Sequence, residues 1–119
     1  MQNEANPILK LTFEFSLAVI SYCEELNNGR KFVLSQQLCK SGTSIGANAN
    51  EAQDAESKAD FIHKFKIAAK EMRETKYWLQ LMAKANDSDA EECRKYWKEA
   101  HELTMIFSKI IITIEKRAE

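Results

Sequence analysis

Apolar side chains recur every third or fourth residue along most of the chain, and few residues interrupt this pattern. The 119-residue sequence contains one proline and three glycines, so it lacks most of the punctuation that sheets and loops need. A repeat near 3.6 residues is typical of amphipathic helices that hide one face in a core. The sequence therefore predicts an all-α protein, and its length allows a single domain over residues 1–119.

The first helix has clear start and stop signals. Asn6 is the expected N-cap and Pro7 the first helical residue, where the missing N–H of proline costs nothing. The helix should run to about Asn27, and Asn27-Asn28-Gly29 predicts a left-handed stop. Its main apolar face is widened by four further residues that we expect to be buried: Leu9, Phe13, Leu17 and Ile20.

Three more helices are predicted after short turns. The second begins near Phe32 and passes through Gly42 and Gly46, which indicates either close approach of another backbone or a local kink. Capping boxes at residues 57–60 and 88–91 open the third and fourth helices. Turns this short join antiparallel neighbours, so we expect an up-down-up-down four-helix bundle.

Residues 41–56 contain only one large apolar side chain, Ile45. Polar members of this segment recur at steps of three and four residues and form one stripe on a helix: Ser41, Ser44, Asn48 and Glu51. The stripe is an exposed polar face, a hydrogen-bonding strip at a helix or subunit interface, or a ligand or catalytic site. The small residues around it, Gly42 and Gly46 among them, favour the interface interpretation.

The segment from Met105 to Ile114 carries more apolar side chains than one face of a helix can hide, because they point in nearly every direction. We therefore expect homo-oligomerisation to cover the surplus. The predicted interface residues are Ile106, Ile110, Ile111 and Ile114.

Enzymatic and metal chemistry find little support in the sequence. A di-metal bundle needs two Glu-x-x-His motifs, and Asp60-x-x-His63 is the only acid at that spacing from a histidine. Neither a glycine-rich phosphate loop nor a nucleophile elbow is present. We predict no catalytic, cofactor-binding or metal-binding residue, and we interpret Cys23, Cys39 and Cys93 as reduced, buried thiols.

Charge and hydropathy indicate which kinds of partner and which cell compartment to expect for the protein. A net charge of −1 and a pI near 6.2 exclude the strongly basic character of a dedicated nucleic-acid coat. No basic N-terminal segment precedes an apolar core, and no apolar run reaches the ~18 residues of a membrane span. We therefore expect a cytoplasmic protein without a membrane partner.

A local basic face is nevertheless predicted on the third helix, where it could contact phosphate groups. Its residues are Lys64, Lys66, Lys70 and Arg73. Glu71 and Glu74 interleave with them, so the alternative is a solvated helix face crossed by ion pairs.

Three segments resemble the four-helix-bundle family of proteins encoded by intervening sequences in bacterial 23S ribosomal RNA genes. They are KSGTSIGANANE at residues 40–51, ESKADF at 56–61 and EMRETKYWLQL at 71–81. The resemblance implies a four-helix protomer that assembles into a homopentameric ring. It also implies kinship with the accessory protein of diversity-generating retroelements, whose basic surface contacts nucleic acid and a reverse transcriptase.

The preferred interpretation is a non-enzymatic, oligomeric helical module that binds a macromolecular partner, with structured RNA or DNA on the basic face as one candidate. The alternative is a protein–protein scaffold or accessory subunit without nucleic-acid binding. An enzyme that uses clefts between subunits is the least favoured interpretation.

Overall fold

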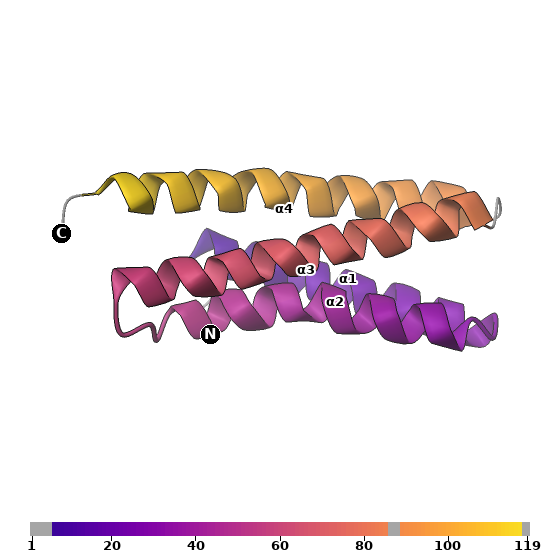
Figure 1. Cartoon of the computed structure of the whole chain (residues 1–119). Helices are drawn as coiled ribbons and strands as arrows, with labels where there is room; N and C mark the ends of the chain where they lie inside the picture. Colours follow the sequence, from indigo (N-terminus) through magenta and orange to yellow (C-terminus); the bar gives the residue numbers. More distant parts are fainter. Residues whose placement is uncertain (1–5, 86–88, 118–119) are drawn as a thin grey trace.

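The structure, a computed structural model, describes residues 6–85 and 89–117, and within these ranges it contains four helices and no strand. The helices are α1 (Pro7–Asn28), α2 (Phe32–Ala52), α3 (Lys58–Ala85) and α4 (Ala90–Lys116). Successive helices run in opposite directions along one long axis (Figure 1). The predicted all-α antiparallel architecture is confirmed.

The start of α1 matches its sequence signals. The side-chain oxygen of Asn6 accepts a hydrogen bond of 3.2 Å from the backbone N–H of Ile8, and Pro7 is the first helical residue. The cap satisfies one of the N–H groups that the first turn of a helix leaves without a partner.

The end of α1 differs from the prediction by one position. Gly29 has φ −84°, whereas Arg30 adopts the left-handed φ of 64°. The N–H of Lys31 donates to the Leu26 carbonyl at 2.8 Å, and the N–H of Arg30 donates to the Asn27 carbonyl at 2.9 Å. This pair of bonds is a Schellman motif, in which glycine is the usual left-handed residue. An arginine therefore occupies the position that glycine would favour.

Replacing Arg30 with glycine should raise the free energy of unfolding by about 0.5 to 1 kcal/mol, because the Cβ clash of the left-handed conformation is removed. Arg30→Ala is the matched control, since it removes the guanidinium but keeps the Cβ. Urea titration of both variants measures the difference. A gain in Arg30→Ala equal to that in Arg30→Gly would show that backbone strain is not the cause.

Helix α2 is unbroken through both glycines, and at both of them α1 lies close against it. A Cβ atom at Gly42 would lie 2.8 Å from a methyl group of Val19. At Gly46 a Cβ would lie 3.3 Å from the Thr12 carbonyl oxygen. Close approach of α1, not a kink, therefore explains the glycines.

The structure describes the predicted cap of α3 but not the predicted cap of α4. In α3 the Ser57 hydroxyl accepts from the Asp60 N–H at 3.0 Å, and the Asp60 carboxylate accepts from the N–H of Glu56 at 3.3 Å. The Ser57 cap is therefore present. The predicted cap residue of α4, Ser88, lies outside the described residues.

The core is continuous along the bundle, and stacked phenylalanine rings of α3 and α4 form part of it. Phe65 stacks on Phe107 with ring centroids 4.7 Å apart, and Phe61 stacks on Phe65 at 4.6 Å. Other fully buried members come from α2 and α3, among them Leu38, Ile45, Met72 and Leu79.

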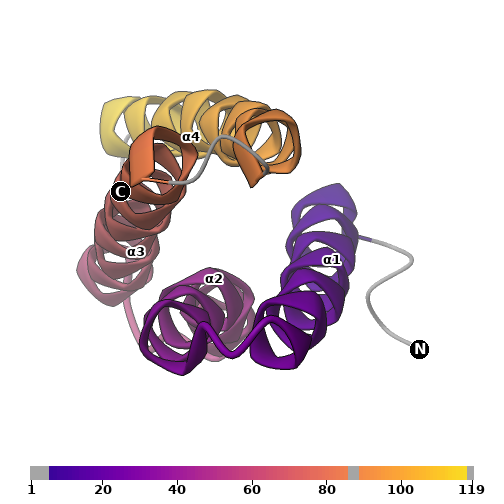
Figure 2. The ribbon, with the colours of Figure 1, turned by 90° about the vertical axis from the view of Figure 1, so that its right-hand side faces the viewer.

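The bundle is open on one side. Each helix packs closely against the next one in sequence, whereas α1 and α4 make few contacts with each other. Viewed down the axis, the four helices follow one another around the core with α1 and α4 on either side of the open edge (Figure 2). Within the described residues, no helix is both long enough and apolar enough to cross a lipid bilayer.

The predicted wide apolar face of α1 is only partly buried. Leu9 is buried, as expected. Phe13, Leu17 and Ile20 are 51%, 53% and 40% exposed, so the prediction of their burial is wrong for an isolated chain. The physical reason is that α2 alone packs closely on α1, and one neighbour covers a narrower sector of a helix than two.

Candidate functional site

The predicted basic residues of α3 do not all share one face. Lys66, Lys70 and Arg73 are exposed along one stripe of the helix. Lys64 lies on the side that faces α2, where its Nζ is 3.4 Å from a Glu51 carboxylate oxygen. Three of the four predicted cations are therefore available together on the outer face.

Acidic side chains partly neutralise this stripe. Lys66 Nζ lies 3.6 Å from a Glu115 carboxylate oxygen of α4. Burial raises the pKa of Glu71, the neighbouring Glu74 carboxylate raises it further, and Lys40 and Lys70 oppose both effects. The solvated, ion-paired face considered above therefore describes part of the stripe.

Two adjoining grooves between α3 and α4 add cations that were not predicted. One has a volume of about 700 Å³ and is lined by Lys84 and Arg94 beside the exposed ring of Tyr77. The other, about 450 Å³, is lined by Arg94 and Lys98 beside Trp97. No acidic side chain among the described residues lines either groove, and none forms an ion pair there with these cations. We call this surface the α3–α4 basic surface.

An aromatic and cationic cluster borders the α3–α4 basic surface. Trp97 and His101 stack with centroids 5.0 Å apart, and Lys76 Nζ lies 5.5 Å from the Trp97 ring and 3.4 Å from His101 Nδ1. Burial lowers the pKa of Lys76, and the nearby Arg73 guanidinium lowers it further. The cluster thus places the Lys76 side chain of α3 against the Trp97 and His101 rings of α4.

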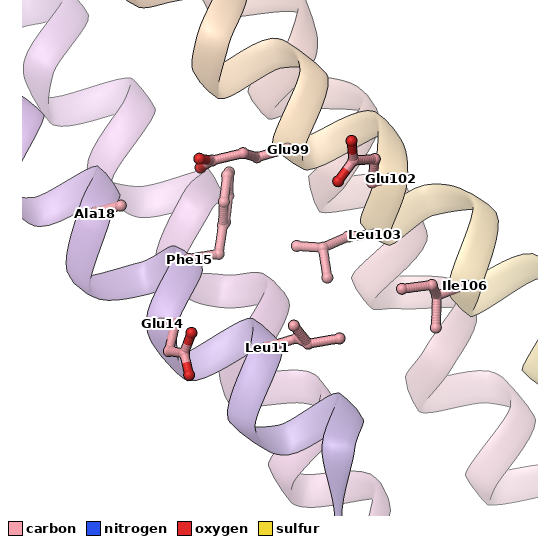
Figure 3. Close-up of a pocket in the computed structure, with 8 residues that line it drawn as sticks. All are labelled: Leu11, Glu14, Phe15, Ala18, Glu99, Glu102, Leu103 and Ile106. Carbon is pink, nitrogen blue, oxygen red and sulfur yellow. The ribbon is translucent and has the colours of Figure 1, made fainter.

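A third groove lies on the open side of the bundle, between α1 and α4, and has a volume of about 350 Å³. Phe15 and Leu103 are buried and form its floor. Leu11 of α1, which is 41% exposed, points toward Leu103 and Ile106 of α4 (Figure 3). We call this feature the α1–α4 groove.

Carboxylates form the rim of the α1–α4 groove. Glu14 comes from α1, whereas Glu99 and Glu102 come from α4, and Glu99 extends toward α1 (Figure 3). Burial raises the pKa of Glu99, Lys95 lowers it, and Glu102 raises it. The groove is therefore apolar at its floor and negative at its edges.

The groove exists because α1 and α4 meet at only one end. There the Tyr22 and Tyr96 rings lie 5.0 Å apart, and the Tyr22 hydroxyl lies 3.3 Å from Cys93 Sγ. Lys31 and Asp89 form an ion pair at the same end. Toward the start of α1, no stacked aromatic pair or ion pair among the described residues joins the two helices.

The predicted polar stripe of α2 makes its hydrogen bonds within the protomer. Ser41 is buried and accepts from the Thr75 hydroxyl of α3 at 2.9 Å. Ser44 Oγ donates to the Lys40 carbonyl at 2.7 Å, and Asn48 Nδ2 donates to the Ser44 carbonyl at 2.8 Å. Glu51, as described, faces Lys64. These contacts require no ligand and no second subunit.

The predicted oligomer-interface residues are half-buried in the protomer. Ile106, Ile110 and Ile111 pack against the protomer core, and Ile114 lines a groove near the ends of α2 and α4. Two other residues of the same segment, Met105 and Ile112, are 54% and 50% exposed. The most exposed apolar side chains of the predicted segment 105–114 are therefore two that are not among the four named interface residues, and burial of the segment between protomers stays a prediction.

The histidine, cysteine and acidic side chains of the described residues are the candidates for a metal or redox site. Among the described residues, no group of three or more histidine, cysteine or acidic side chains is placed to hold a metal ion. The three cysteines are unpaired, with Cys23 and Cys93 buried and Cys39 half-buried. Burial raises the pKa of Cys23 to about 12, and the adjacent Cys39 thiol adds to the effect, so Cys23 is a protonated thiol at neutral pH.

Comparison with known proteins settles the family. The sequence profile of the 23S rRNA-intervening sequence proteins matches residues 4–109, which is most of the chain. The chain belongs to this family. The resemblance noted in the sequence is thereby confirmed.

The fold is also similar to that of one other protein of solved structure. It is a protein of unknown function from the S23 ribosomal protein family of Bacteroides thetaiotaomicron VPI-5482, with 38% sequence identity and a TM-score of 0.83. The match covers 87% of this chain and 97% of the other. No curated protein sequence matches the chain significantly.

Proposed function

We propose that the protein is a non-enzymatic, oligomeric helical module that binds nucleic acid on the α3–α4 basic surface. The observation that carries the proposal is the clustering of Lys84, Arg94 and Lys98 in two adjoining grooves that no carboxylate of the described residues lines. Binding to phosphate depends mainly on such cations, whatever the net charge of the whole chain.

Aromatic side chains at the same surface support single-stranded regions of a folded RNA as the ligand. Tyr77 is 56% exposed beside Lys84, and Trp97 lines the neighbouring groove. Positive grooves with aromatic rings bind single strands by combining phosphate contacts with base stacking. The family takes its name from 23S rRNA, which makes fragments of that RNA the first probe.

Self-association is a separate part of the proposal, and the exposed apolar side chains support it. Phe13, Leu17 and Ile20 form a stripe on α1 by steps of four and three, and Met105 and Ile112 are exposed on α4. Soluble monomers rarely leave such stripes uncovered. A ring of five chains, as implied by the family resemblance, would also repeat the basic surface and strengthen binding through multivalency.

Fluorescence anisotropy with labelled 23S rRNA fragments tests the nucleic-acid proposal. Arg94→Glu should weaken binding by about tenfold, because a phosphate contact is lost and a repulsion is added. Affinity should also fall steeply as salt is raised. Lys10→Glu, an equal charge reversal on α1 away from the α3–α4 basic surface, is the matched control and should change affinity by less than about twofold.

Two results would contradict this proposal. One is an affinity that responds equally to Arg94→Glu and Lys10→Glu, which would indicate only general attraction. The other is the absence of binding at about 10 μM protein in low salt, which would leave the protein scaffold as the better interpretation. Light scattering on the same samples tests self-association independently, and a monomeric mass of 13.7 kDa would contradict that part.

A further inference from the structure

The α1–α4 groove has no role in the function proposed above, and its charge opposes that role. Its rim carries Glu14, Glu99 and Glu102, which would repel phosphate. Beside its buried floor the groove offers accessible apolar side chains, since Leu11 is 41% exposed and Ile106 is only half-buried. A ligand complementary to the groove is therefore apolar on one side and positive at its edges.

The carboxylates of the rim are poorly compensated within the protomer. Lys10 Nζ lies 4.0 Å from Glu14, and both side chains are more than half exposed, so their attraction is weak. Neither Glu99 nor Glu102 has an ion-pair partner among the described residues. Lys95 offsets part of the charge of Glu99, so the rim keeps a partial preference for added positive charge.

Further acidic residues continue the negative edge toward the closed end of the seam. Glu92, Glu25 and Glu99 all lie close enough to Tyr96 to raise the pKa of its hydroxyl, in addition to the effect of burial. Glu25 comes from α1 and Glu92 from α4, so both sides of the seam carry acidic residues, with Lys95 Nζ 5.6 Å from the Tyr96 ring as a cation among them. An elongated positive partner would meet complementary charge along its length.

The shape of the groove favours a helix as that partner. Its walls are two antiparallel helices that diverge from one another on the open side of the bundle. A helix laid between them would pack its apolar ridge into the groove as a fifth member of the bundle. Side chains at the edges of such a ridge would lie next to the rim carboxylates.

We propose that the α1–α4 groove docks an amphipathic helix of a partner protein, with leucine-like anchors on its apolar ridge and lysine or arginine along both edges. The anchors contact Leu11, Leu103 and Ile106, while the cations pair with the rim carboxylates. The partner is thus a protein with a basic amphipathic helix, and its site is distinct from the α3–α4 basic surface.

A designed peptide is the direct probe. It has about 18 residues, with leucines at positions i, i+4, i+7 and i+11 and lysines on both flanks. Fluorescence anisotropy of the labelled peptide against the full chain should give a Kd in the range of about 1 to 50 μM. The matched peptide with glutamate in place of every lysine should bind at least about tenfold more weakly.

Variants of the chain locate the site. Glu102→Lys should weaken binding of the lysine peptide by about tenfold, and Leu11→Gln by about fivefold, because each removes one of the two recognition elements. The matched controls are Glu24→Lys on α1, the same charge reversal, and Val33→Gln on α2, a similar apolar-to-polar exchange; both positions are exposed and lie outside the groove. Both controls should bind as the unchanged chain does.

Three outcomes would overturn the proposal. Equal binding of the lysine and glutamate peptides would remove the charge argument. Unchanged binding in both Glu102→Lys and Leu11→Gln would place the peptide elsewhere. A peptide that fails to bind, together with a multimer that dissociates in Leu11→Gln and Glu102→Lys, would show that a second copy of the chain fills the groove. RNA binding of Glu102→Lys, measured in parallel, reports on the α3–α4 basic surface separately.

Discussion

Replacing Phe107 with alanine is expected to lower the free energy of unfolding by about 3 to 5 kcal/mol, which is a large part of the stability of a domain this small. Phe107 is fully buried, and its ring stacks on Phe65 at 4.7 Å. Truncation removes this contact and leaves a cavity between α3 and α4, which the rigid helices cannot fill by collapse. Chemical denaturation followed by circular dichroism measures the change.

Phe13→Ala is the matched control for this experiment. It removes the same atoms from a ring that is 51% exposed on α1, so the monomer should lose no more than about 0.5 kcal/mol. The comparison is made at a protein concentration low enough to keep the chain monomeric. A loss below about 1 kcal/mol for Phe107→Ala would mean that the aromatic stack contributes little.

Local sequence signals were sufficient to predict the helices. The caps at Asn6 and Ser57 depend on bonds between residues two to three positions apart, so a short window of sequence contains both partners. The inward positions of α2, such as Leu38 and Ile45, follow from the helical repeat alone.

The basic face was predicted less well, although the helical repeat contains the answer. Lys64 and Lys66 are two positions apart, which turns their side chains by about 200° around a helix. Lys64 and Lys66 therefore cannot both lie on the face of Lys70 and Arg73. The structure places Lys64 beside Glu51 instead. The predicted set grouped cations by their position in the sequence. Their angular positions around the helix separate Lys64 from the others.

Features that depend on helix pairing could not be predicted. Lys84 and Arg94 line one groove only because α3 and α4 are adjacent and rotated so that both side chains point outward. Leu11 and Ile106 line the α1–α4 groove although 95 positions separate them in the sequence. Periodicity gives the direction of each side chain around its own helix, but not the neighbours of that helix.

The near-zero net charge of the chain gives no sign that its charged side chains form separate acidic and basic surfaces. Negative side chains such as Glu99 and Glu102 gather on the open side of the bundle, whereas Arg94 and Lys98 lie on the α3–α4 basic surface. Two surfaces of opposite charge cancel in the sum for the chain, yet each can attract its own partner. Binding function in a near-neutral helical protein is therefore judged from the position of its charges.

Replacing Gly42 with leucine is expected to destabilise the fold by about 3 kcal/mol or more. Even the Cβ atom would lie 2.8 Å from the Val19 side chain, and the rest of a leucine would force α1 away from α2. Leucine has the better helix propensity by about 1 kcal/mol, but this gain is smaller than the packing loss. Gly29→Leu is the matched control, since a Cβ there meets nothing closer than 3.5 Å.

A double-mutant cycle shows whether contact with Val19 is the cause. Gly42→Ala alone should destabilise the protein by about 1 to 2 kcal/mol, because its Cβ cannot be placed without moving Val19. In the Val19→Ala background the same substitution should be neutral or stabilising, since space is available and alanine favours the helix. Urea titration of the four proteins gives the coupling energy, expected at about 2 kcal/mol. Additive effects would mean that Gly42 is required for a reason other than the close approach of α1.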